Sequence, residues 1–142
     1  MKVIIAGSRS FNDYPLLKTT CEKIFSQLQW EHELSSKDFE IVSGKAGGAD
    51  SLGERFAKEY GIQIKEFPAK WDDLKAKDAF IKTNSFGKPY NAKAGHARNT
   101  SMLEYVSDDG CAIYFWDGES PGTKDCITKA KKMGIRYFWV KI

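Results

Sequence analysis

Residues 42–60, VSGKAGGADSLGERFAKEY, join an apolar run to a helical pattern through a loop rich in glycine. Gly44, Gly47 and Gly48 lie close together in this loop. Glycine loses more backbone entropy on folding than other residues, so such a cluster indicates unusual dihedral angles or close approach of another group. The stretch therefore predicts either a tight turn or a ligand lying against bare backbone amides.

The flanks of this loop predict a strand before it and a helix after it. Residues 39–43 form a short apolar run, which is typical of a buried strand. Leu52, Phe56 and Tyr60 then recur on one helical face, and Gly61 suits the end of that helix. The stretch is thus one strand–loop–helix unit.

The same alternation continues along the whole chain. Strands are expected at residues 2–6, 39–43, 62–67, 110–116 and 135–140. The first helix is expected at about 15–30, the second ends at residue 60, the third begins at about 94, and the fourth ends at residue 133. The third strand ends at Pro68 and is expected near a sheet edge. Strands that alternate with helices predict an α/β fold with a mainly parallel sheet of about five strands, covered on both faces. We expect one domain over residues 1–142.

An irregular segment at about 70–93 interrupts the pattern. It is rich in lysine, aspartate, asparagine and glycine. Loops this long are usually functional or mobile, so we expect a lid or an oligomer contact. Within it, residues 73–83 have the pattern of a short helix.

The composition argues against several classes of partner. The net charge is only +3 with no basic block, which argues against nucleic acid. The apolar run in MKVIIAG is too short for a signal peptide or membrane span, and the odd number of cysteines, three, lacks a CxxC motif. We therefore expect a cytoplasmic protein with free thiols and no membrane partner. His32 and His96 lie far apart, so no metal or cofactor is expected.

The first candidate loop follows the first strand. Gly7 permits a sharp turn, and Ser8, Arg9 and Ser10 offer hydroxyls, amides and a guanidinium suited to phosphate. An ordinary turn with a solvent-facing arginine is equally compatible with these residues.

The second candidate loop is the glycine stretch itself, here Gly44, Lys45, Gly47 and Gly48. It is neither a Walker loop nor GxGxxG, but it leads to a helix N-terminus, where free amides and the dipole favour an anion. Asp50 repels phosphate, yet it suits a helix cap or a ribose hydroxyl.

The third candidate group begins the helix at about 94. Arg98 opposes the helix dipole there, which favours a ligand role for it and for the adjacent Asn99. The alternative is a salt bridge from Arg98 to Asp72, Asp73 or Asp117. Met102 and His96 are interpreted as core and loop residues.

The fourth candidate loop lies between Trp116 and the last helix. Its candidate ligand residues are Trp116, Asp117, Gly118, Ser120, Gly122 and Thr123. Glycine and hydroxyl side chains before a helix suit phosphate binding or capping. The indole of Trp116 suits base stacking, and core packing equally.

These loops together resemble the SLOG superfamily of Rossmann-like proteins, and most closely its YspA/YpsA-related branch, which is frequent in bacteria and phages. The matching residues are IIAGSRSF, SGKAGGADSLGERFAKE, FPAKW, AGHARNTSM and FWDGESPGT, in the order of the family. The resemblance implies a Rossmann-like three-layer fold and a nucleotide-derived ligand over the strand ends. It also implies that the loop after Trp116 binds phosphate and that the protein forms a homo-oligomer.

A related branch resembles phosphoribohydrolases, whose pattern contains Arg-x-x-x-Met and a later PGGxGTxxE. Arg98 and Met102 fit the first part, but the catalytic glutamate position, three residues after Thr123, is Cys126. The sequence therefore favours a protein that senses or sequesters an ADP-ribose-like compound, an NAD metabolite or a cyclic nucleotide. A nucleotide-processing N-glycoside hydrolase, in which Asp50 or Asp117 replaces the glutamate, and a DNA-associated module are the alternatives.

Overall fold

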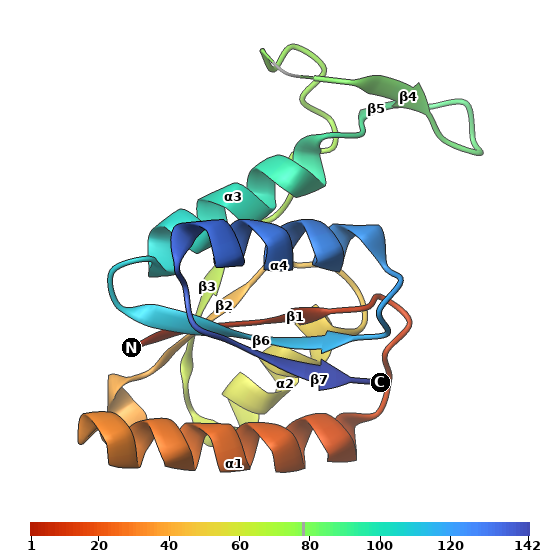
Figure 1. The fold of residues 1–142 in the computed structure, drawn as a ribbon. Helices are drawn as coiled ribbons and strands as arrows, with labels where there is room; N and C mark the ends of the chain where they lie inside the picture. Colours follow the sequence, from red (N-terminus) through yellow and green to blue (C-terminus); the bar gives the residue numbers. More distant parts are fainter. Residues whose placement is uncertain (78) are drawn as a thin grey trace.

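A computed structural model describes residues 1–77 and 79–142, and its centre is one parallel sheet (Figure 1). The strands are β1 (Lys2–Gly7), β2 (Glu40–Ser43), β3 (Gln63–Glu66), β6 (Gly110–Trp116) and β7 (Tyr137–Lys141), and the order across the sheet is β3-β2-β1-β6-β7. Every neighbouring pair in it is parallel. The predicted α/β class with five parallel strands is confirmed, and β3 lies at an edge as expected.

Helices cover both faces of this sheet. They are α1 (Tyr14–His32), α2 (Ala49–Tyr60), α3 (Ala94–Val106) and α4 (Pro121–Met133), with a short 3-10 turn, η1, at Ser36–Asp38. Figure 1 shows α3 and α4 above the sheet and α1 and α2 below it. The arrangement is the three-layer Rossmann-like fold.

The side chains of the central strands alternate between two hydrophobic cores. On β1, Val3 and Ile5 pack with α1 and α2, whereas Ile4 packs with α3 and α4. These side chains are buried on both faces, which is why the strands read as continuous apolar runs. The sheet thus forms a rigid base whose carboxyl ends carry the candidate loops.

The helix ends differ in how their amides are satisfied. At the start of α1 the Asp13 carboxylate accepts a hydrogen bond from the Leu16 amide, at 3.1 Å. No side chain caps α2, α3 or α4 within the described ranges. Three helix N-termini therefore keep amides that are not satisfied by a capping residue.

The segment between Trp71 and α3 is an arm, residues 72–93, that projects beyond α3 (Figure 1). Its strands β4 (Ile81–Thr83) and β5 (Pro89–Asn91) pair antiparallel. The short helix predicted over residues 73–83 is therefore wrong where the structure describes them, because turns and β4 take its place. A turn at Gly87 (φ +76°) closes the hairpin and exposes Phe86 to 92%.

In the part of the chain that the structure describes, no helix has both the length and the apolar character needed to cross a bilayer.

Candidate functional site

A cleft of about 520 Å³ opens at the carboxyl ends of the strands. It lies where the strand order reverses, between β1 and β6, which is where open α/β sheets usually bind ligands. Its size is typical of small-molecule sites. The predicted residues that line it are Gly7, Arg9, Ser10, Asp50, Arg98, Asn99, Ser120, Gly122 and Thr123. Residues from all four candidate loops thus meet in one hollow.

Arg98 reaches the cleft from the first turns of α3. Its guanidinium donates hydrogen bonds to the Gly44 carbonyl and, through Nε, to Asn99 Oδ1 at 3.0 Å. The alternative salt bridges from Arg98 to Asp72, Asp73 or Asp117 are not among the ion pairs of the described residues. Burial lowers the pKa of Arg98. A half-buried cation that takes part in none of the ion pairs found among the described residues is suited to an anionic ligand.

Asp50 is buried in the same cleft, in the first turn of α2. Its Oδ2 accepts a hydrogen bond from the Ala46 amide at 3.2 Å, so the carboxylate closes its own loop. Burial raises the pKa of Asp50 to about 6, although that hydrogen bond and the nearby Arg98 act in the opposite direction. Asp50 is therefore both a loop-closing group and the one carboxylate that lines the cleft among the described residues.

Gly44 separates these two charged groups. A Cβ on Gly44 would lie 2.5 Å from an Arg98 nitrogen and 2.8 Å from Asp50 Oδ2. The absence of a side chain is thus what lets the guanidinium approach the loop before α2.

The N-terminus of α4 faces the cleft with free donors. Pro121 lacks an N–H, and the amides of Gly122 and Thr123 donate to no protein atom that the structure describes. Nothing lies within 4 Å of a Cβ built on Gly122, so the backbone here is open to a ligand. Free amides and the positive end of the helix dipole make this terminus a suitable phosphate site.

Ser8 holds the surrounding loops together. Its hydroxyl accepts hydrogen bonds from the Asp117 amide (3.2 Å) and the Ser120 hydroxyl (3.1 Å), and its carbonyl accepts from Ala49 N (3.3 Å). Ser8 itself is fully buried. It therefore positions the loops after β1, β2 and β6 and does not line the cleft.

A second hollow of about 300 Å³ adjoins the cleft and shares Arg9, Ala46, Trp71 and Arg98 with it. The other predicted residues that line this hollow are Gly44, Lys45 and Gly47.

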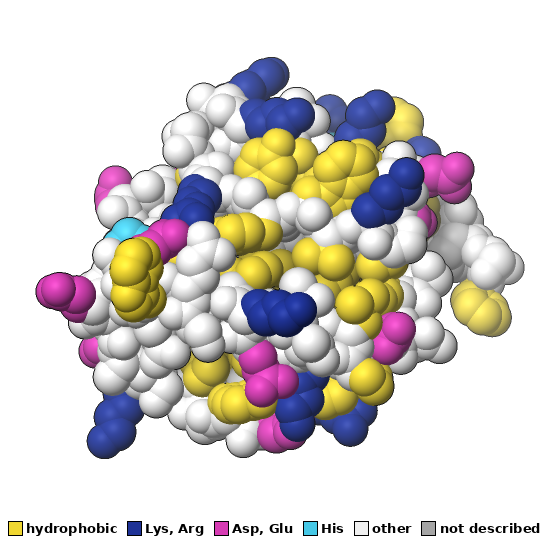
Figure 2. All heavy atoms as spheres, turned by 60° about the horizontal axis from the view of Figure 1, so that its bottom comes forward, with side chains coloured by type: hydrophobic (Ala, Val, Ile, Leu, Met, Phe, Trp, Pro, Cys, Tyr) yellow, Lys and Arg dark blue, Asp and Glu magenta, His cyan; other side chains and the backbone are white. Residues whose placement is uncertain are grey.

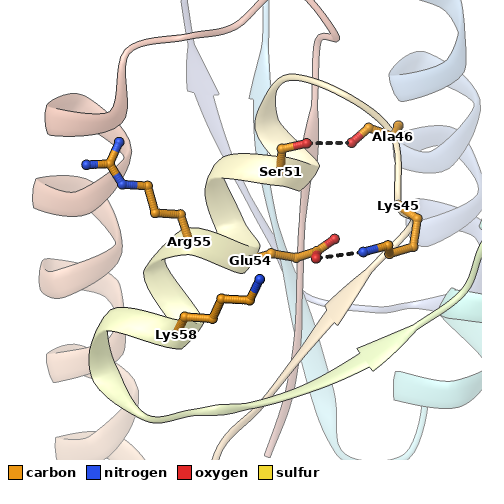
Figure 3. Close-up of a pocket in the computed structure, with 6 residues that line it drawn as sticks. All are labelled: Lys45, Ala46, Ser51, Glu54, Arg55 and Lys58. Atoms are coloured by element: carbon orange, nitrogen blue, oxygen red, sulfur yellow. Dashed lines mark hydrogen bonds and ion pairs between the residues drawn. The ribbon is translucent and has the colours of Figure 1, made fainter.

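Lys45 also borders a third hollow, of about 390 Å³, on the outer side of α2 (Figure 3). Its ammonium binds Glu54 at 2.8 Å and Glu66 at 3.6 Å. Burial alone would raise the pKa of Glu54, but hydrogen bonds from Lys45 and Ser43 keep it below its usual value. The Lys45 charge is thus already neutralised by the protein.

The remaining predicted residues support the loops. Gly48, at φ +68°, packs against the backbone of the first loop: its Cβ would lie 2.3 Å from the Ser8 carbonyl. Asp117 accepts from the Glu119 and Ser120 amides at 2.8 Å each, and Gly118 turns the chain at φ +86°.

Trp116 is buried, where its indole donates to Ser120 O at 3.0 Å. The structure thus places Trp116 in the core, and the base-stacking interpretation loses its geometric basis.

The sequence was compared with known proteins. The family model described as "YspA, cpYpsA-related SLOG family" matches residues 1–73, just over half of the chain. The chain belongs to this SLOG family. It is also 29% identical to the Gene 61 protein of Mycobacterium phage D29 over 134 residues, which cover 94% of this chain and 91% of the relative. No solved structure matches it significantly. Membership of the SLOG family suggests a nucleotide-related function.

Within this SLOG chain, nine residues that were not predicted as ligand contacts also line the cleft, and four of them carry an aromatic ring or a sulfur atom. These four are Trp71, His96, Met102 and Cys126. Trp71 follows β3 and stands beside the first loop, where the Arg9 guanidinium lies 5.6 Å from its ring centre. FPAKW was part of the family resemblance, but nothing in its local pattern indicated that Trp71 faces the strand ends.

Cys126 takes the position of the hydrolase glutamate at the cleft floor. Its sulfur lies 3.0 Å from the Tyr114 hydroxyl, and burial raises its pKa to about 11, so it is a neutral thiol. The adjacent Asp125 binds Lys129 at 3.0 Å and accepts from Asn99 at 3.2 Å. Asp125 therefore does not supply the missing carboxylate.

Proposed function

We propose that this SLOG protein binds a nucleotide-derived small molecule, an ADP-ribose-like compound, an NAD metabolite or a cyclic nucleotide, in order to sense or sequester it. One observation carries the proposal: a single cleft brings the uncapped N-terminus of α4 together with Arg9 and Arg98. Free amides and guanidinium groups are the donors that recognise phosphate.

The phosphate of the ligand is assigned to the α4 terminus. The amides of Gly122 and Thr123 and the Thr123 hydroxyl provide neutral donors there. Arg98 and Arg9 border both the cleft and the adjoining hollow, so they suit a second phosphate or the far side of the first.

The ribose and base are assigned to the other side of the cleft. The Asp50 carboxylate is an acceptor for ribose hydroxyls, and the exposed part of the Trp71 indole, 37% accessible, offers a face for a base. This arrangement replaces Trp116 with Trp71 as the proposed stacking residue.

The residue at the floor of the cleft supports binding without turnover. A neutral thiol at Cys126 does not stabilise the oxocarbenium-like transition state that a glutamate would. The second candidate, an N-glycoside hydrolase, is favoured by one observation: Asp50 lies in the cleft with a pKa near 6, close to the range of a working acid–base group.

The test is a thermal-shift panel of AMP, ADP-ribose, NAD and cyclic nucleotides with the wild type and two arginine variants. A compound at a hundred times its Kd should stabilise the fold by about 2.7 kcal/mol, or roughly 5–10 °C. Arg98→Ala should weaken binding by about 10–100-fold, because a hydrogen bond to a charged group is lost. Arg55→Ala is the matched control, since it removes a guanidinium from the hollow of Figure 3 and not from the cleft.

Three outcomes would contradict the assignment. Loss of binding in Arg55→Ala but not in Arg98→Ala would move the site to the outer side of α2. No shift with any compound would overturn nucleotide binding. Release of free base, detected by chromatography after incubation, would replace the binding protein with the hydrolase.

A further inference from the structure

Strand β7 forms an uncovered apolar edge of the sheet. Phe138 and Val140 pack toward the core between the sheet and helices α1 and α2, while Trp139 is 51% exposed. The view of Figure 2, which brings the α1 side of Figure 1 forward, shows hydrophobic side chains gathered across the middle of that face. Natural sheets usually protect such edges with charges, prolines or a covering element.

The backbone of β7 presents unused hydrogen-bonding groups on this edge. Arg136 O accepts from Ala112 N at 3.0 Å and Ile142 N donates to Trp116 O at 3.3 Å, so both residues face β6. Backbone polar groups point alternately to the two sides of a strand, so those of Tyr137, Trp139 and Lys141 face away from β6.

We propose that β7 pairs antiparallel with β7 of a second copy of the chain, about a two-fold axis at Trp139. Trp139 then exchanges both backbone hydrogen bonds with Trp139 of the other copy, and Tyr137 lies opposite Lys141. This register uses all the outward groups of the strand, and the lysines never face each other. A two-fold interface must be self-complementary in this way.

The composition of the two sheet edges supports a second copy as the occupant. The other edge, β3, carries Lys65 and Glu66, which are the kind of charged side chains that discourage pairing. In β7 only Lys141 is charged, at the end of the strand. The apolar, self-complementary edge is therefore the one suited to a copy of itself, and it joins two sheets into one.

This interface connects to the loop before α4. The Trp139 indole donates to Trp116 O at 3.2 Å, and the Trp116 indole donates to Ser120 O at 3.0 Å. The interface therefore fixes a side chain that supports the α4 terminus, while the cleft itself remains outside the contact.

The test is sedimentation velocity on the whole protein at about 1–100 µM, which detects a dimer whose dissociation constant lies in or below this range. The wild type should sediment as a dimer at the upper end. Lys141→Pro removes one outward amide and should weaken the dimer at least about tenfold, whereas Lys141→Ala, which keeps the amide, should not. Trp139→Glu should give a monomer, because two carboxylates then face each other.

Trp30→Glu is the control for the aromatic substitution. Trp30 is 83% exposed on α1, so its replacement should leave the dimer intact. Circular dichroism melts establish that each variant is folded. A monomeric wild type at 100 µM, a dimer unaffected by folded Lys141→Pro and Trp139→Glu, or one lost in Trp30→Glu, would overturn the proposal.

Discussion

The loops before α2 and α4 both look like phosphate loops, yet the structure uses them differently. In the first, the amides of Lys45, Ala46 and Ala49 already donate to protein atoms. In the second, the amides of Gly122 and Thr123 have no such partner among the described residues. In the part of the chain that the structure describes, the first loop also keeps free amides at Gly47 and Gly48, and the second also has satisfied amides at Glu119 and Ser120. The two loops therefore differ in where the free amides lie, because Gly122 and Thr123 line the cleft whereas Gly47 and Gly48 do not.

The glycines in these loops meet different needs. Gly48 is required because the Ser8 carbonyl, in the loop after β1, lies 2.3 Å from where its Cβ would be. Gly44 is required because an Arg98 nitrogen lies 2.5 Å from the corresponding position. Gly118 and Gly122 have nothing within 4 Å of a built Cβ. Glycine therefore reflects close packing at Gly44 and Gly48 but open space at Gly118 and Gly122, and the contacts of a built Cβ distinguish the two cases.

The largest difference between the two loops is expected when the stability of Gly48→Ala is compared with that of Gly122→Ala. Gly48→Ala should lower the free energy of unfolding by about 3 kcal/mol or more, because the backbone is strained for alanine and Ser8 blocks its Cβ. Gly122→Ala, in the first turn of α4, should be neutral or stabilise by up to about 1 kcal/mol. Urea unfolding of both variants measures the difference, and equal losses would show that the second loop is packed as tightly as the first.

The pH dependence of stability should isolate Asp50. Its folded pKa, about 6, exceeds the ordinary 3.8, so the folded state holds a proton that the unfolded chain releases between these values. The contribution of Asp50 to the free energy of unfolding therefore falls by about 2–3 kcal/mol as the pH rises from about 4 to above 6. The stability of Asp50→Asn relative to wild type should therefore rise by this amount from pH 4 to 8 in urea unfolding.

Glu54→Gln on the same helix is the opposing control for that titration. The Glu54 pKa is lowered, so its contribution is present above pH 4.5 and is lost as the pH falls. The stability of Glu54→Gln relative to wild type should thus decrease as the pH rises. If the stability difference between Asp50→Asn and wild type does not change with pH, burial does not raise the pKa of the Asp50 carboxyl.

The smallest expected effect concerns the hydroxyl at the α4 terminus. Thr123→Val keeps the side-chain shape and should weaken nucleotide binding about 3–10-fold, by removing one neutral hydrogen bond to phosphate. Thr128→Val is the matched control, because the Thr128 hydroxyl donates to Lys124 O, at 2.9 Å, on the exposed side of the same helix. Titration calorimetry with the compound found in the thermal panel measures both, and equal affinities would remove Thr123 from the site.

Sequence patterns predicted the fold well because its central strands, β1, β2 and β6, are buried on both faces. The expected strand 110–116 is β6, and Gly61 ends α2 in the left-handed conformation as predicted. The arm was missed because its hairpin is exposed and lacks the alternation that a core imposes. Within the site, the loop ends were predictable from strand–glycine–helix patterns. The inward position of Trp71 and the core position of Trp116 were not, because each depends on contacts with residues distant in sequence.

The central position of β1 has a consequence for the two halves of the chain on either side of the arm. β1 pairs with β2 before the arm and with β6 after it, and Arg98 also binds back to Gly44. A protease cut at the exposed turn near Phe86 therefore leaves two fragments that share one sheet and stay associated until they unfold. We therefore expect a cut in the arm to interrupt the chain without separating the two halves of the sheet.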